Sequence, residues 1–197
     1  MAKAHKKSSG SAASNNSKWV GIIIALVVIA VVAFFAMHSN KNKGEPTTGL
    51  NASNSSNSSS TNGGTGTLSV DPSNQSVTSG NVLTLSLYED SQADAVNAVQ
   101  TNLTYPTDKF DLVKIDTTGS AFAIKAQQDG GGGTIKIARG TINPVTGKQL
   151  VAKVQLKAKA SSGTADVEFA NGSGIVRSSD NKEILQNTNG ATFTLTQ

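Results

Sequence analysis

The sequence contains no cysteine, and residues 67–197 also lack histidine and tryptophan. Without cysteine the chain can form no disulfide, no thiolate metal site and no cysteine nucleophile. Because both histidines precede residue 67, a Ser-His-Asp triad and a histidine zinc site are excluded from residues 67–197. Carboxylates remain, and six of them fall at predicted turns or on outward strand positions, where solvated charge is the ordinary role: Asp108, Asp111, Asp116, Asp166, Glu168 and Asp180. We therefore expect neither an enzyme nor a cofactor.

Net positive charge is confined to the N-terminal third. Four lysines lie in residues 1–18, two lysines and one glutamate in residues 39–66, and 11 Lys or Arg against 12 Asp or Glu in residues 67–197. The formal net charge of +4 and the pI of about 9.3 therefore come from the N-terminal third. Residues 67–197 lack the basic patch that nucleic-acid binding requires, so no nucleic-acid partner is expected.

The longest apolar run, Trp19–Met37, contains no charged residue. A helix of about 20 residues spans ~30 Å, the thickness of the hydrocarbon layer, so residues 19–38 are predicted to form one transmembrane helix. The run is longer than the core of a signal peptide, and no Ala-x-Ala site follows it, so we expect an uncleaved signal anchor. Four lysines before the run and two after it favour a cytoplasmic N-terminus and an extracellular C-terminal domain.

The segments on both sides of this run are of low complexity. Residues 1–18 form a short basic tail, and residues 39–66 are rich in Ser, Asn, Thr and Gly. Such segments have too few apolar side chains to offset the entropy of folding. We predict a disordered cytoplasmic tail and a flexible linker with a reach on the order of 30 Å. The absence of disulfides in the extracellular part favours a bacterial cell surface.

Residues 67–197 show a period of two, with turn residues about every ten positions. This pattern predicts an all-β antiparallel sandwich of nine or ten strands, a jelly roll being one such arrangement. The expected strands are Thr67–Val70, Val82–Tyr88, Val96–Tyr105, Phe110–Ile115, Phe122–Ala126, Thr134–Arg139, Leu150–Ala160, Thr164–Phe169, Gly174–Ser178 and Ala191–Leu195. Turns are expected at 71–74, 130–133 and 143–147.

Three local features have residues of the kinds found in ligand sites. The glycine run 130–133 precedes a strand rather than a helix, which favours a turn over a phosphate loop. Segments 90–94 and 179–183 carry oxygen ligands without the spacing of an EF-hand, so solvated turns are expected there and calcium stays open. Tyr88 lies on the opposite side of its strand from three leucines, and it is the best candidate for an exposed ring that stacks on a sugar.

The stretch 96–113 resembles the signature of cohesin domains, in which a strand runs into Tyr-Asp-Pro-x-x-Leu-x-Val. Here the strand leads into Tyr105-Pro106, with Phe110 and Val113 after it. The resemblance extends from about Leu68 to Leu195. Cohesins are nine-stranded jelly-roll sandwiches that bind dockerin modules through one sheet face, and in cellulosomes they assemble polysaccharide-degrading enzymes.

The resemblance also implies a binding face. In well-studied cohesins an Asn-x-Asp pair before the conserved tyrosine contacts the partner, and the matching positions are Ala98 and Gln100. The outward side of this strand is then Ala98, Gln100 and Asn102, which carries no charge. We predict a membrane-anchored, cohesin-like module that recognises a dockerin-type or other envelope protein. The alternatives are a carbohydrate-binding module with Tyr88 as a contact, and a structural or adhesive envelope protein.

Overall fold

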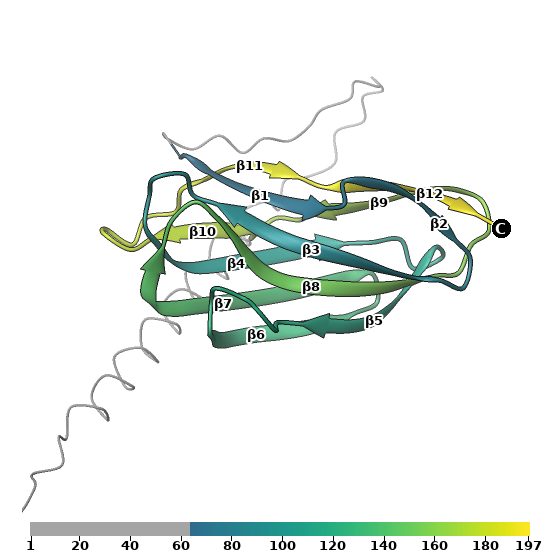
Figure 1. The fold of residues 1–197 in the computed structure, drawn as a ribbon, viewed down its shortest axis with the longest axis horizontal. Helices are drawn as coiled ribbons and strands as arrows, with labels where there is room; N and C mark the ends of the chain where they lie inside the picture. The colour runs from purple at the N-terminus through teal and green to yellow at the C-terminus, as the bar shows by residue number, and fades with distance from the viewer. Residues whose placement is uncertain (1–63) are drawn as a thin grey trace, which may run out of the picture.

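A computed structural model describes residues 64–197, which form two β-sheets packed face to face (Figure 1). The all-β sandwich predicted from the alternation is therefore confirmed. No helix among residues 64–197 is long and apolar enough to cross a bilayer. The predicted cytoplasmic tail, transmembrane helix and nearly all of the linker lie outside the described residues.

Twelve strands make up the sandwich. The five-stranded sheet has the order β11-β1-β3-β8-β5, and the other has the order β2-β12-β9-β4-β7-β6, with β10 also paired to β4. The first sheet consists of β11 (Leu185–Asn189), β1 (Gly66–Asp71), β3 (Val82–Asp90), β8 (Lys148–Ala158) and β5 (Phe110–Asp116). The second, seven-stranded sheet consists of β2 (Asn74–Thr78), β12 (Ala191–Thr196), β9 (Gly163–Phe169), β4 (Val96–Thr104), β7 (Thr134–Val145), β6 (Ile124–Gly131) and β10 (Gly174–Arg177).

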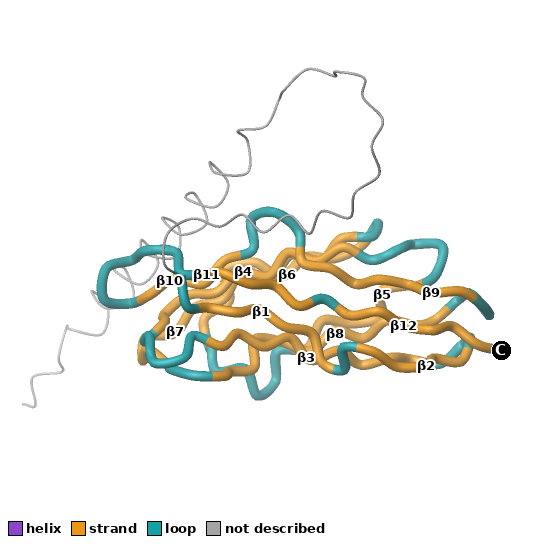
Figure 2. The backbone as a smooth tube through the Cα atoms, turned by 90° about the horizontal axis from the view of Figure 1, so that it is seen from above, coloured by secondary structure: helices purple, strands orange, loops and turns teal. Residues whose placement is uncertain are grey.

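The two ends of the described chain run beside each other and connect the sheets (Figure 2). β1 continues into β2 after two residues, and β11 continues into β12 after Gly190, so each pair passes from one sheet to the other. β1 pairs with β11 and β2 pairs with β12, in both cases parallel. These two parallel pairs depart from the fully antiparallel sandwich predicted from the sequence, because the alternation gives no information on strand direction.

Gly190 makes the second of these crossings possible. A Cβ atom at this position would lie 2.6 Å from the carbonyl oxygen of Val167 and 3.3 Å from the Cα atom of Glu168. Both neighbours belong to the backbone of β9, which cannot move without breaking its pairing with β12. A glycine is therefore required where β11 passes into β12.

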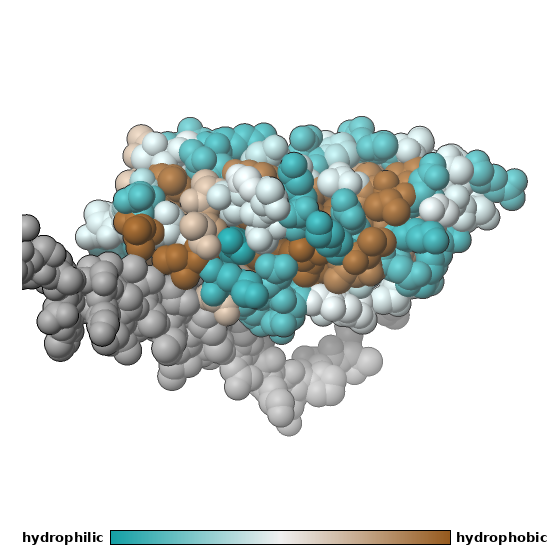
Figure 3. Space-filling view, turned by 60° about the horizontal axis from the view of Figure 1, so that its bottom comes forward, coloured by the Kyte–Doolittle hydropathy of each residue, from teal (hydrophilic) through white to brown (hydrophobic). Residues whose placement is uncertain are grey.

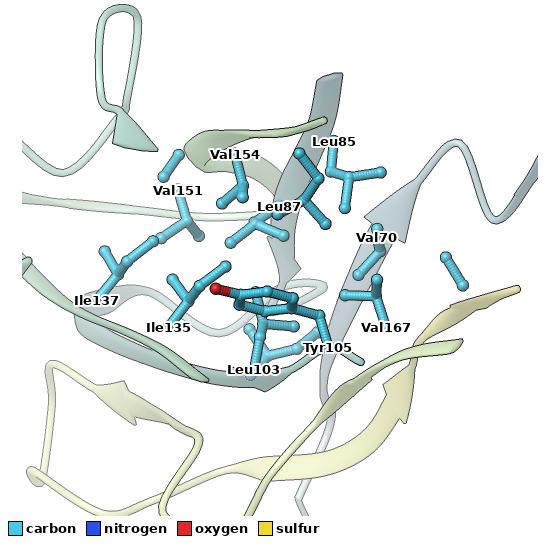
Figure 4. Close-up of a cluster of buried hydrophobic side chains, with 14 of the residues drawn as sticks. Val70, Leu85, Leu87, Leu103, Tyr105, Ile135, Ile137, Val151, Val154 and Val167 are labelled. Atoms are coloured by element: carbon cyan, nitrogen blue, oxygen red, sulfur yellow. The ribbon is translucent and has the colours of Figure 1, made fainter. Parts of the chain in front are cut away.

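The core lies between the sheets and is built by alternate residues of each strand. On β3, Leu83, Leu85 and Leu87 are each at most 4% exposed, while the residues between them face outward. Figure 4 shows leucine and valine side chains from β3 and β8 packed against Ile135, Ile137 and Tyr105 from the opposite side of the sandwich. Each fully buried leucine contributes roughly 1.5–3 kcal/mol through loss of apolar surface.

The strands differ from prediction at four places. β2 and β11 are short strands at the sheet edges with a single buried or half-buried apolar residue each, so their sequences carry no alternation signal. Phe122 lies before β6 rather than in it, and its carbonyl oxygen accepts a hydrogen bond from Nε of Arg139 at 2.7 Å. β7 extends to Val145, so the turn predicted at 143–147 is shorter than expected, and the reversal falls at Thr146 and Gly147, the latter with φ of 68°. The two additional strands raise the number from the predicted nine or ten to twelve.

Candidate functional site

The four residues predicted for binding lie on two different faces of the sandwich. Ala98, Gln100 and Asn102 share the outward side of β4, in the seven-stranded sheet, whereas Tyr88 lies on the outward side of β3, in the five-stranded sheet. Val99 and Leu103, which alternate with the first three, point into the core. The sandwich therefore separates Tyr88 from the other three, and they cannot contact one ligand together.

The outward residues around Gln100 form a surface that we name the β4 face. Strand register places three rows across β10, β4, β7 and β6. The rows are Val176, Ala98, Gly140 and Ile124; then Gly174, Gln100, Ala138 and Gln127; then Asn102, Lys136 and Asp129. Only the last row is charged, and its Lys136 and Asp129 lie opposite each other. The centre of the β4 face is therefore uncharged, and its small side chains are themselves buried, with Ala98 7% and Ala138 2% exposed.

Asn102 is held by the turn between β9 and β10. Its backbone N–H donates to Oγ of Ser173 at 3.0 Å, and its side-chain Nδ2 donates to the carbonyl oxygen of Asn171 at 3.0 Å. Its Oδ1 accepts a hydrogen bond from Nε2 of Gln100 at 3.3 Å. The polar groups of Asn102 are thus satisfied within the chain, so Asn102 positions its neighbours instead of offering free groups to a ligand.

Gln100 differs from Asn102 because half of its amide group is unpaired. Nε2 is bound to Asn102, but Oε1 has no hydrogen-bond partner among the described residues. The side chain is 8% exposed. A buried acceptor without a partner costs about 1–3 kcal/mol, and Oε1 is itself closed to solvent, so Gln100 destabilises the sheet at this position.

Tyr88 is covered in part by a lysine from the neighbouring strand. Nζ of Lys148 lies 4.5 Å from the centroid of the Tyr88 ring, which is the geometry of a cation–π contact. The outward side of this sheet also has its charges arranged in cross-strand pairs of opposite sign. In register, Lys148 lies opposite Asp90, Lys153 opposite Asp116 and Lys157 opposite Asp111. Asp116 and Asp111 form their ion pairs with Lys114 and Lys159, each at 2.9 Å. This face therefore offers neither a free aromatic platform nor a continuous basic surface.

The two acidic segments considered for calcium are brought together by an arginine. Nε and Nη2 of Arg177 bind the two carboxylate oxygens of Asp180 at 3.0 and 2.8 Å, and Nη1 lies 3.4 Å from Oδ1 of Asp94. The Arg177 hydrogen bonds lower the pKa of Asp180 to about 2, and the hydroxyl of Thr65 lowers that of Asp94. No group of three or more Asp, Glu or His side chains within residues 64–197 could hold a metal ion.

One polar residue that sequence reasoning missed is Glu89. It continues the inward side of β3 after Leu87, it is 0% exposed, and neither carboxyl oxygen has a hydrogen-bond partner in the described part of the chain. Burial raises the pKa of Glu89 to about 8, against a smaller lowering by the side chain of Ser91. Oγ of Ser91 and Oδ1 of Asn97 are likewise buried without partners. Glu89 thus lies in the core, away from the β4 face.

Of the comparisons with known proteins, only the one with solved structures finds matches. No protein-family model matches the sequence, and no curated protein matches it. Solved structures do match the described domain. A cohesin of Clostridium acetobutylicum, solved in complex with a dockerin, has a TM-score of 0.56 at 16% identity, over 67% of this chain and 100% of the other.

The domain has a cohesin fold. A Clostridium thermocellum cohesin in a type I cohesin–dockerin complex matches with a TM-score of 0.55 at 12% identity, over 66% of this chain and 93% of the other. A non-cellulosomal cohesin of the archaeon Archaeoglobus fulgidus matches with a TM-score of 0.53 at 16% identity, over 67% and 91%. The cohesin fold predicted from the stretch 96–113 is therefore confirmed.

Proposed function

We propose that this chain is a membrane-anchored cohesin-like module that binds a protein partner at the cell surface through the β4 face. The observation that carries the proposal is the match of the whole described domain to cohesins solved with dockerins bound. The β4 face is chosen because it contains Ala98 and Gln100, which match the Asn-x-Asp pair that contacts the partner in well-studied cohesins. The uncharged centre of the face also fits a recognition surface.

The partner is a dockerin-like module or another envelope protein. A carbohydrate ligand at Tyr88 is less well supported, because Lys148 already lies over the ring. Binding, and not catalysis, is the activity proposed. If the β4 face binds no protein and the face of Tyr88 binds no carbohydrate, a structural or adhesive role without a small ligand is the remaining alternative.

Replacement of Gln100 by arginine should abolish partner binding. The full chain with this substitution, used to capture proteins from the native cell envelope, should retain the wild-type partner at least tenfold less well. The reason is that a guanidinium group between Ala98 and Ala138 would be desolvated without a carboxylate opposite it. Tyr88→Ala is the matched control and should leave capture unchanged. Capture that survives Gln100→Arg would contradict the proposal, and glycan binding lost on Tyr88→Ala would favour the carbohydrate alternative.

The membrane anchor is proposed from the sequence alone. The uncharged run Trp19–Met37 has four lysines on its N-terminal side, and the Ser/Asn-rich segment 39–66 would separate it from the domain. Protease added to intact cells should therefore remove residues 67–197 and leave the N-terminal tail protected, as read by antibodies to tags at the two ends. A domain that is digested only after the cells are permeabilised would contradict this orientation.

A further inference from the structure

Among residues 64–197, β2 is the one edge strand that lacks the features by which proteins keep sheet edges from pairing. The strands at the ends of the two sheet orders are β11, β5, β2 and β6. In three of them an extra residue interrupts the register with the neighbouring strand, namely Val113 in β5, Ala126 in β6 and Gln186 in β11. β5 and β6 also carry charged side chains. Bulges and charges of this kind oppose pairing with another chain.

The side of the sandwich that contains β5 and β6 is closed further by a contact between the two sheets. Nε2 of Gln128 in β6 donates to the carbonyl oxygen of Ile115 in β5 at 3.2 Å. This side is turned toward the viewer in Figure 3, where hydrophilic side chains break up the hydrophobic patches. A strand added at β5 or β6 would have to disturb this contact.

β2 (Asn74–Thr78) is regular, uncharged and largely exposed. Its five residues pair in step with residues 192–196 of β12, without an extra residue in either strand. Only Val77 is buried, with 5% of its surface exposed. β2 lies beside β12 at the border of the domain, near the C-terminus (Figure 2). The nearest charged residue in the sequence, Asp71, comes before the strand and lies outside it.

The backbone hydrogen bonds at the two ends of β2 show which of its groups are free. The N–H of Thr192 donates to the carbonyl oxygen of Ser73 at 2.9 Å. The N–H of Ser79 donates to the carbonyl oxygen of Thr196, also at 2.9 Å. Because such bonds alternate along a parallel pair, the odd-numbered residues of β2 bond to β12. The N–H and C=O groups of the even-numbered residues therefore point away from the sheet, on the side where no described strand pairs with β2.

We propose that β2 pairs with β2 of a second copy of this chain, antiparallel across a twofold axis at Ser76, so that two seven-stranded sheets join into one. The strand is self-complementary in this register. Ser76 faces Ser76 of the second copy, and Asn74 faces Thr78, so small polar side chains meet and no like charges are opposed. A charged strand such as β5 or β6 would meet its own charges in the same arrangement.

The free backbone groups of β2 match those of its copy. At the axis, the N–H of each Ser76 donates to the carbonyl oxygen of the other. On either side of the axis, the N–H of Thr78 donates to the carbonyl oxygen of Asn74. The carbonyl oxygen of Thr78 already accepts from the N–H of Asn81 at 3.0 Å, so the paired stretch ends at this residue.

The pairing is small, and it fixes how the two domains face. Five residues per copy are typical of a weak interface, which the membrane anchor proposed above would strengthen by raising the effective concentration. Directly opposed residues of joined strands point to the same side, so the two β4 faces also lie on one side of the joined sheet. The inference does not depend on partner binding, but a pair of copies would present two β4 faces together.

Disulfide cross-linking tests the pairing, because the chain contains no cysteine of its own. The full chain with Ser76→Cys, in phosphatidylcholine vesicles under mild oxidation, should form covalent dimers at least tenfold faster than Thr194→Cys. Cα atoms that face each other at the axis are about 5.5 Å apart, within reach of a disulfide. Thr194 is the matched control, since it is exposed in the same row, one strand further from the edge, and about 14 Å from its copy. Mixed Asn74→Cys and Thr78→Cys chains should cross-link to each other and not to themselves.

Charge reversal at the axis provides a second test. Energy transfer between labelled full chains in the same vesicles measures their association. Ser76→Lys should weaken it at least tenfold, because two like charges would face each other. A mixture of Ser76→Lys and Ser76→Asp chains should restore association to within threefold of wild type. Thr194→Lys, on the same side of the sheet, should change it less than threefold.

Several results would overturn the inference without touching the proposed function. Equal cross-linking of Ser76→Cys and Thr194→Cys would show that β2 does not pair with its copy, as would association that survives Ser76→Lys. Asn74→Cys chains that cross-link to themselves would refute the antiparallel register. If Ser76→Lys abolishes capture of an envelope protein while wild-type chains do not associate, the edge accepts a strand of that protein and self-pairing is refuted. The β4 face is tested separately, by Gln100→Arg.

Discussion

Replacing Glu89 by glutamine is expected to raise the free energy of unfolding at pH 9 by about 3–5 kcal/mol. In the folded chain this carboxyl is fully buried, and its pKa is raised to about 8 by burial. In an unfolded chain a glutamate ionises near pH ~4.3. At pH 9 the wild type must therefore bury a carboxylate whose oxygens have no partner, whereas glutamine has the same shape and no charge to bury.

The pH profile gives the sign of this effect. Between about pH 4.5 and pH 8 the folded state binds a proton that the unfolded state has released, so the free energy of unfolding of the wild type falls as the pH rises, and it levels off above pH 8. Asp180 acts in the opposite direction on the acid side. Its pKa of about 2 means that its stabilising contribution is complete above roughly pH 4 and is lost as the pH falls through 2. Stability should therefore be greatest near pH 4–5.

Urea unfolding at pH 4.5, 7 and 9 would measure the effect of Glu89. Wild type and Glu89→Gln should be similar at pH 4.5 and diverge steadily above it. Glu168→Gln is the matched control, because Glu168 is an exposed glutamate on β9, and it should follow the wild type at every pH. Parallel profiles for Glu89→Gln and wild type would show that Glu89 ionises in the folded state much as it does in water.

Replacing Phe193 by alanine should cost about 3–5 kcal/mol of unfolding free energy, because a fully buried aromatic side chain leaves a cavity. Phe193 lies on β12 of the seven-stranded sheet and meets Phe110 from β5 of the other sheet, with ring centroids 6.2 Å apart and planes at 86°. Such edge-to-face pairs add roughly 0.5–1.5 kcal/mol beyond burial. The substitution therefore weakens the contact between sheets as well as the core itself.

A double-mutant cycle separates the two contributions. Phe193→Leu and Phe110→Leu, alone and together, should show a coupling energy of about 0.5–1.5 kcal/mol in urea unfolding at pH 5. Val113→Ala on β5 is the control, since Val113 is 51% exposed, and it should change stability by less than about 0.5 kcal/mol. Additive costs for the two phenylalanines would mean that the rings contribute through burial only.

Most of the fold could be predicted because most strands bury one side against the other sheet. On β8, Val154, Leu156 and Ala158 alternate with exposed or half-buried residues, and this alternation fixed both the strand and its inward side. β2 and β11 could not be found, since Asn74–Thr78 and Leu185–Asn189 bury almost nothing and are held by backbone pairing to β12 and β1. A pattern of side chains contains no information on backbone pairing at a sheet edge.

The candidate site was predictable in position and not in detail. Parity alone placed Ala98, Gln100 and Asn102 on one side of β4. The groups that orient them, Asn171 and Ser173, lie about 70 positions away in sequence, and only the folded pairing of β4 with β10 brings them close. Glu89 could have been found by extending the inward alternation of Leu83, Leu85 and Leu87 by one more step.

The pairing of β1 with β11 also bears on how the chain is made. Leu68 lies beside Thr188, and the continuation of each strand pairs in the same way in the other sheet. During synthesis β1 and β2 therefore cannot complete their pairing until β11 and β12 have emerged, and neither sheet has its final edge before then. Contacts between such distant positions make folding slow. Until then β1 and β3 expose apolar sides and open edges, so the nascent domain depends on being kept apart from its copies.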